Sequence, residues 1–127
     1  MDLSLLIVDD NLPFLEAAGA LLARDGLDVI GLASTATEAI SRVEVLRPDV
    51  VLVDVGLAGE SGFELARRLL RAGRDEMPTV VLMSTHAEAD LADLIAQSPA
   101  AGFVAKSQLS AAAIRQLIPH SEAPHPA

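Results

Sequence analysis

The chain has 127 residues, of which 51% are hydrophobic, and it contains no cysteine, tryptophan or tyrosine. Its length predicts one domain that buries about two-thirds of the surface of the unfolded chain, around an aliphatic core. The lack of cysteine excludes a disulfide framework or a thiolate metal site and suits the cytoplasm. The formal charge of −9 argues against nucleic acid as a direct partner, because phosphate binding needs a basic face. No stretch has the pattern of a signal peptide or a membrane span.

The first strand pattern ends on acidic residues. Four apolar residues, 5–8, predict a strand buried on both faces, and Asp9 and Asp10 follow it directly. Asp10 or Asn11 is expected to cap the next helix, which stops at Gly26. The inward stripe of that helix is expected to comprise Leu12, Leu15, Ala18 and Leu22.

A second strand and helix follow. Residues 29–33 predict a short strand, and Thr35 with Glu38 three residues later is a capping-box pattern that opens a helix ended by Pro48. The inner face of this helix is expected to comprise Ala36, Ala39, Ile40, Val43 and Leu46.

The central stretch of the chain is 49–59. Residues 50–53 are all apolar and mostly β-branched, which predicts a strand buried on both faces, as in a parallel sheet. The strand ends on Asp54, and a glycine-rich loop follows. Ligands of open α/β sheets bind just beyond the carboxyl ends of the strands, so Asp54 lies where the binding or active site of such a fold is expected. The alternative is that Asp54 only caps a turn.

The second half repeats this alternation. Strands are predicted at 79–83 and 102–105, and the latter ends on Lys106, the only lysine among nine basic residues. Ser61 with Glu64, and later Ser110, are the expected helix caps. The inward residues of three further helices, the middle one spanning 88–97, are expected to be Leu65, Ala66 and Leu69, then Leu91, Leu94 and Ile95, then Ile114, Leu117 and Ile118.

Five strands alternating with five helices predict an α/β fold. Short loops between them favour a five-stranded parallel sheet with right-handed crossovers and helices on both faces. The flavodoxin-like strand order, 2-1-3-4-5, is the commonest such arrangement. The domain is expected to span 1–118, and 119–127, with three prolines, is expected to be a disordered tail.

In this order, polar residues meet at one end of the sheet. Asp9, Asp10 and Asp54 leave the first and third strands, while Ser84 and Lys106 leave the fourth and fifth. Clustered carboxylates repel one another unless a cation or protons compensate, and oxygen ligands without His or Cys indicate Mg²⁺. Mg²⁺ beside a carboxylate, a hydroxyl and an ammonium is a combination suited to phosphoryl transfer. In it Asp54 would be the nucleophile, and Ser84 and Lys106 would bind phosphoryl oxygens.

These residues and their spacing resemble the receiver domain of bacterial two-component response regulators. Asp54 comes forty-four residues after Asp10, Ser84 comes thirty after Asp54, Phe103 nineteen after that, and Lys106 three later. The resemblance covers residues 4–118 and implies a stand-alone, flavodoxin-like phosphorylation switch.

The family pattern implies a role for each matching residue. Asp54 would accept a phosphoryl group from a histidine kinase or phosphotransfer protein, Lys106 would pair with that group, Ser84 would move to bond it, and Phe103 would change rotamer. The implied ligands of Mg²⁺ are Asp9, Asp10, Asp54 and the backbone carbonyl of Gly56. Such a domain catalyses only its own phosphorylation and dephosphorylation. It is expected to be a monomer or weak dimer and to be bound by an unknown downstream protein.

The sequence departs from the family pattern at three loop positions. Ala58 and Ser107 stand where prolines are usual, and Ser61 replaces an acidic residue before Gly62. Ser107 leaves the geometry of the preceding peptide bond open. Phe103 lacks the hydroxyl of a tyrosine, so we expect its inward position to cost less. These departures bear on loop geometry and phosphoryl lifetime and remove no reacting group.

Histidines and arginines outside this set have simpler interpretations. His86 lies two residues after Ser84, where the family places side chains that tune loss of the phosphoryl group; the alternative is a solvated loop histidine. His120 and His125 are expected to belong to the tail rather than to a metal site. A solvated helix face, or else a contact for an acidic partner, is expected of Arg67, Arg68, Arg71 and Arg74.

Two other functions are compatible with the fold. A non-phosphorylated interaction module could keep the fold while losing the chemistry, although every reacting group is present. An aspartyl-phosphate phosphatase of the haloacid-dehalogenase type would need an acid two residues after Asp54, where Gly56 stands. A flavin or nucleotide site is disfavoured, because the loops lack a G-x-G-x-x-G run.

Overall fold

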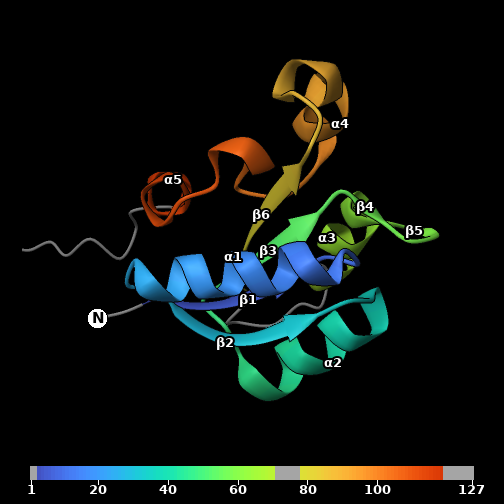
Figure 1. Ribbon diagram of the computed structural model, residues 1–127. Helices are drawn as coiled ribbons and strands as arrows, with labels where there is room; N and C mark the ends of the chain where they lie inside the picture. Colours follow the sequence, from blue (N-terminus) through green and yellow to red (C-terminus); the bar gives the residue numbers. More distant parts are fainter. Residues whose placement is uncertain (1–2, 71–77, 119–127) are drawn as a thin grey trace, which may run out of the picture.

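A computed structural model describes residues 3–70 and 78–118 and contains a parallel sheet between two layers of helices (Figure 1). In spatial order, the strands of the sheet are β2 (Asp28–Ala33), β1 (Ser4–Val8), β3 (Val50–Asp54), β6 (Thr79–Ser84) and β7 (Gly102–Ala105). All four neighbouring pairs run parallel. Counted within this sheet, the order is the predicted 2-1-3-4-5, so the flavodoxin-like class is confirmed.

The helices divide between the two faces of the sheet. One face carries α1 (Leu12–Arg24) and α5 (Ala111–Leu117), which Figure 1 shows in blue and red. The other carries α2 (Ala36–Leu46), α3 (Gly62–Leu70) and the pair η1 (Glu88–Leu91) and α4 (Ala92–Gln97). This division buries the apolar strands from both sides, as their unbroken apolar runs predicted.

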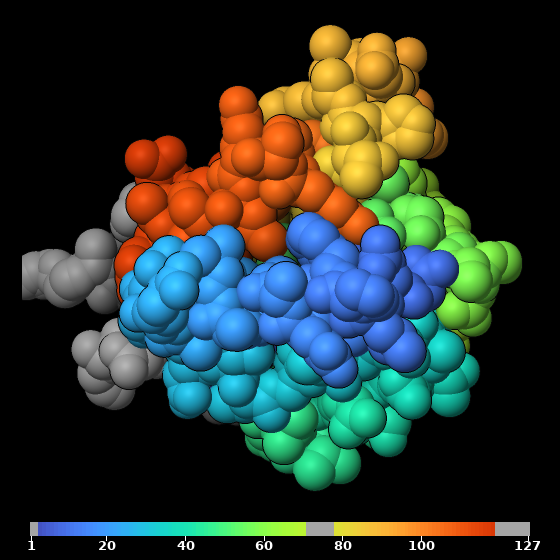
Figure 2. Space-filling model, in the orientation of Figure 1, coloured from blue at the N-terminus to red at the C-terminus, as the bar shows by residue number. Residues whose placement is uncertain are grey.

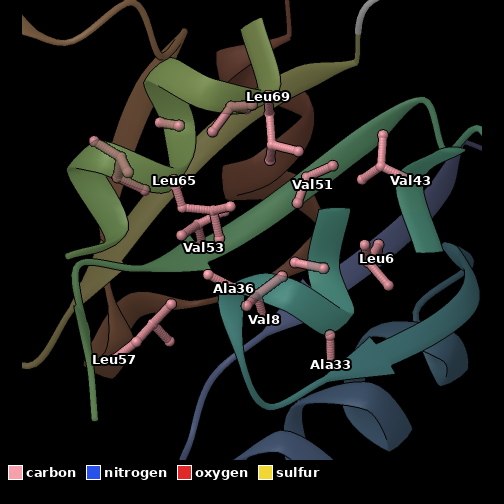
Figure 3. Close-up of a cluster of buried hydrophobic side chains, with 14 of the residues drawn as sticks. Leu6, Val8, Ala33, Ala36, Val43, Val51, Val53, Leu57, Leu65 and Leu69 are labelled. Carbon is pink, nitrogen blue, oxygen red and sulfur yellow. The ribbon is translucent and has the colours of Figure 1, made fainter. Parts of the chain in front are cut away.

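Successive side chains of each central strand point alternately into two separate hydrophobic cores, one on each face of the sheet. In β1, Leu6 and Val8 face the layer of α2 and α3, whereas Leu5 and Ile7 face α1 and α5. The alternation follows from the two-residue period of a strand. Figure 3 shows the first core, where Val51 and Val53 of β3 meet side chains of α2 and α3.

Polar side chains begin four of the helices as the sequence indicated. The capping acceptors are the side-chain oxygens of Asn11, Thr35, Ser61 and Ser110. Asn11, rather than Asp10, therefore caps α1. The carboxylate of Glu38 bonds to the backbone and hydroxyl of Ser34, one residue before the partner that a capping box would use.

Two of the residues predicted to point inward do not. Leu12 and Leu94 are 55% and 47% exposed, so these predictions were wrong. Leu46 is 39% exposed, but its side chain lies over Gly31 of β2, where its Cδ1 would be 3.1 Å from an added Cβ. The predicted helix 88–97 is divided into a 3-10 turn and a six-residue helix, and this pair packs against the core through Leu91 of η1 and Ile95 of α4.

The loop after β3 contains a hairpin that the sequence did not predict. Strands β4 (Gly56–Leu57) and β5 (Glu60–Ser61) pair antiparallel around Ala58 and Gly59. Gly59 has a φ of 70°, which glycine adopts without strain. Two-residue strands carry too little periodicity to be seen in a sequence.

Some predictions fall outside the described residues. These are Arg71, Arg74 and the tail 119–127 with its two histidines. Within 3–70 and 78–118, none of the helices is long and apolar enough to cross a membrane.

Candidate functional site

The predicted acidic cluster forms at the carboxyl ends of β1 and β3. The two parallel strands pair with Val8 beside Val53. Asp9 and Asp54, which each come one residue later, therefore lie side by side where the two strands end. Asp9 is fully buried and Asp54 is 8% exposed, whereas Asp10 is exposed. One carboxylate oxygen from each of the three lies within 4.8 Å of the others.

The side chain of Lys106 reaches both buried carboxylates. Its Nζ lies 2.6 Å from Oδ2 of Asp9 and 3.5 Å from Oδ2 of Asp54, and the lysine side chain is 10% exposed. No partner among the described residues gives Asp9 Oδ2 a hydrogen bond of acceptable geometry, so its close contact with Lys106 is an ion pair. The only lysine of the chain thus compensates part of the buried negative charge.

The environment of Asp54 opposes its ionisation. Burial raises the pKa of the Asp54 carboxyl above its ordinary value of 3.8, and the negative charge of Asp9 raises it further. Lys106 and the backbone N–H of Gly56 lower the same pKa, but they do not reverse the shift. An additional cation in the cluster would favour the carboxylate form.

The donor set fits a hard divalent cation. Among the described residues the cluster offers three carboxylates with neither imidazole nor thiolate, and the buried Oδ2 of Asp9 makes an ion pair with Lys106 but no hydrogen bond. Such oxygen ligands suit Mg²⁺, which keeps several of its own waters. The residues predicted from the sequence as metal ligands are therefore compatible with that ion.

Ser84 lies next to the cluster and contacts His86. Asp54 pairs with Met83 on β6, so Ser84 is one residue further along the adjacent strand and is 2% exposed. Its Oγ accepts a hydrogen bond from the backbone N–H of His86 at 3.0 Å and lies 3.3 Å from Nδ1 of the same residue. His86 is exposed, as a loop histidine would be, but its ring is held beside the Ser84 hydroxyl.

Phe103 and the residues after Lys106 have well-defined positions. Phe103 is 8% exposed and packs in the core shared with α2 and α3, which is the inward position. The short helix η2 (Lys106–Gln108) follows β7, and the described peptide bonds, that between Lys106 and Ser107 included, are trans.

Three further residues shape the site and were not singled out from the sequence. The ring of Phe14 lies 4.3 Å from Nζ of Lys106. Oε1 of Glu60 accepts a hydrogen bond from the backbone N–H of Ala36, which ties the β4–β5 hairpin to the start of α2. A Cβ at Gly62 would collide with the carbonyl oxygen of Asp54. Of the three, only Gly62, a glycine at the start of the predicted helix, could have been noticed in the sequence.

Comparison with known proteins agrees with this geometry. The model of the family described as "Response regulator receiver domain" matches residues 5–118. The chain therefore belongs to the response regulator receiver domains, which are signalling modules of two-component systems. The resemblance inferred from the sequence is confirmed.

Individual relatives are bacterial response regulators. The response regulator GacA of Pseudomonas viridiflava is 36% identical over 102 residues, which cover 80% of this chain and 47% of that protein. The DNA-binding transcriptional activator DevR/DosR of Mycobacterium tuberculosis is 38% identical over 101 residues, or 79% of this chain and 46% of that one. The chain thus spans about half the length of these relatives.

Among solved structures, the signal receiver domain of the response regulator NarL from Mycobacterium tuberculosis superimposes with a TM-score of 0.79. The two are 26% identical, and the match covers 91% of this chain and 94% of that one. This similarity supports the same fold over the described sheet and helices.

Proposed function

We propose that Asp54 accepts a phosphoryl group from a histidine kinase or phosphotransfer protein and that the resulting change of surface is sensed by a partner protein. The observation that carries the proposal is the pairing of one ammonium with two buried carboxylates, at 2.6 and 3.5 Å, beside the exposed Asp10. A structural ion pair would not need a third carboxylate, a raised pKa at Asp54 and a buried serine one strand away.

The transfer is a displacement at phosphorus. A carboxylate oxygen of Asp54 forms the new P–O bond while the P–N bond of a phosphohistidine breaks, and the electron pair of that bond stays on the imidazole. Lys106 binds a phosphoryl oxygen and offsets the added charge. Mg²⁺ would be held by Asp9, Asp10, Asp54 and the backbone carbonyl of Gly56, where it would neutralise charge on the phosphoryl oxygens.

The switch would operate through Ser84 and Phe103. A phosphoryl group brings roughly −1.5 to −2 charges and three acceptor oxygens, which attract the hydroxyl of Ser84 away from His86. Phe103 changes rotamer as Ser84 moves, and His86 influences how long the phosphoryl group persists. A groove lined by Phe103, by the loop after β6 and by α5 residues from Ala113 to Leu117 supports this proposal, because any repacking there alters the surface.

The proposed switch acts in the cytoplasm as a monomer or weak dimer and transforms no separate substrate. It passes its signal by binding a protein rather than nucleic acid or membrane. The net charge of −9 supports a protein partner over nucleic acid.

Intact-mass measurement after incubation with acetyl phosphate and Mg²⁺ tests the acceptor. We expect one added phosphoryl group on the wild type and on Asp28→Asn, which alters an exposed aspartate of β2, and none on Asp54→Asn. The phosphorylated form of a histidine kinase should give the same result. Failure of both donors would favour the non-phosphorylated interaction module.

The proposed switch has a separate test. Beryllofluoride, a phosphoryl analogue, should shift the backbone amide resonances of residues 84–106 in the NMR spectrum of the wild type. If only the amides next to Asp54 shifted, phosphorylation would not be transmitted to this surface.

A further inference from the structure

The aromatic ring of Phe14 covers one side of the Lys106 ammonium. Nζ lies 4.3 Å from the ring centroid, within the range of about 6 Å over which a cation is attracted to the face of an aromatic ring. Phe14 belongs to the first turn of α1, whereas Lys106 follows β7. Figure 2 shows the blue surface of α1 against the orange surface of the later segment.

The contact closes a ring of interactions around the site. The backbone N–H of Asn11 donates to Oδ1 of Asp9 at 2.9 Å, and the side chain of Asn11 accepts from the N–H of Phe14 at 3.2 Å. The Phe14 ring contacts Lys106, whose Nζ returns to Oδ2 of Asp9 at 2.6 Å. The position of the Phe14 ring is therefore linked, through the cap of α1, to the carboxylate that Lys106 binds.

From this arrangement we propose that Phe14 is a positioning residue for Lys106. An aromatic face attracts the ammonium without offering a lone pair, so it restrains Nζ beside Asp54 without competing with the phosphoryl oxygens for its protons. Phe14 also shields Nζ from water on that side, which strengthens its interaction with the reacting charges. The inference rests on the proposed role of Lys106 in phosphoryl transfer.

Leucine and tyrosine at position 14 separate the ring from its bulk. Phe14→Leu keeps an apolar side chain of similar size and should slow phosphorylation by acetyl phosphate about three- to tenfold at saturating Mg²⁺. Phe14→Tyr keeps the aromatic face and should restore a rate near that of the wild type. The matched control is Leu22→Val, which weakens the packing of α1 at a fully buried residue away from Lys106 and should leave the rate unchanged.

A second measurement reports the contact without any phosphorylation. Because Lys106 is the only lysine, its ε-methylene gives one lysine resonance in a ¹³C-resolved NMR spectrum. The ring current of Phe14 should displace the proton shift of this resonance in the wild type and in Phe14→Tyr. In Phe14→Leu the displacement should be lost, and in Leu22→Val it should be retained.

The outcomes distinguish this inference from the proposed function. Equal rates for the wild type and Phe14→Leu, or equal losses in Phe14→Leu and Phe14→Tyr, would overturn the positioning role. An unchanged lysine resonance in Phe14→Leu would do the same. A wild type that takes up no phosphoryl group from acetyl phosphate or from a phosphorylated histidine kinase, while the lysine resonance still depends on the ring, would reject the proposed function and leave the contact established.

Discussion

Nζ of Lys106 lies closer to Oδ2 of Asp9, at 2.6 Å, than to Oδ2 of Asp54, at 3.5 Å. The ammonium thus sits on the most deeply buried of the three carboxylates, where a divalent cation is also expected. Two cations in one small cluster repel each other, so metal binding there would compete with this ion pair.

Replacing Lys106 should therefore raise the affinity for metal. In Lys106→Met the cluster keeps its three carboxylates and loses the competing charge, and we expect Mg²⁺ to bind about tenfold more tightly by calorimetric titration. Lys106→Arg keeps the charge and should stay near the wild type. Weaker binding in Lys106→Met would mean that the lysine organises the ligands rather than competing with the ion.

The raised pKa of Asp54 predicts a pH-dependent stability without metal. Because the folded-state pKa lies above the unfolded one, this group contributes stability below its ordinary value of 3.8 and loses that contribution as pH rises through the folded-state pKa. Asp54→Asn removes the ionisation, so it should unfold at a higher urea concentration than the wild type at pH 7 in the presence of a chelator.

The difference in urea midpoint between Asp54→Asn and the wild type should shrink toward pH 4. It should also shrink on addition of Mg²⁺, because the ion would compensate the charge of the carboxylates. Asp28→Asn, at an exposed aspartate, is the control and should track the wild type. A difference independent of pH would show that packing of the amide, and not charge, explains the effect.

Gly62, the first residue of α3, should be harder to replace than Gly56 in the loop after β3. An added Cβ would collide with the carbonyl of Asp54, so Gly62→Ala must displace either α3 or the acceptor, at a cost of about 2–3 kcal/mol in the free energy of unfolding. Gly56→Ala is the matched control, because no atom lies within 4 Å of a Cβ there. Chemical denaturation of both variants checks this, and equal stabilities would contradict it.

Glu60 should stabilise the hairpin through α2. Oε1 of its carboxylate accepts a hydrogen bond from the backbone N–H of Ala36, in the first turn of that helix, with an N–O distance of 3.1 Å. Glu60→Ala should lower the free energy of unfolding by about 1 kcal/mol, as loss of a helix cap does, whereas Glu60→Gln keeps an acceptor and should lose less. Urea unfolding measures both, and an equal loss would show that charge rather than the hydrogen bond matters.

The sheet was predictable because each central strand is buried on both faces and reads as an unbroken apolar run. The caps at Asn11 and Thr35 were predictable because capping is local in sequence. The exposure of Leu94 and the hairpin at Gly56 were not predictable, since one depends on how a short helix meets the sheet and the other on two-residue strands.

The sequence by itself determined the fold class and the set of polar residues at the strand ends, because strand periodicity and the order of elements decide which residues leave the sheet together. Only the tertiary structure decided which contacts these residues make. The pairing of Lys106 with Asp9, the ring of Phe14 over Nζ and the link from Glu60 to α2 join segments distant in the chain. Such contacts depend on the packing of helices against the sheet, which no local pattern encodes.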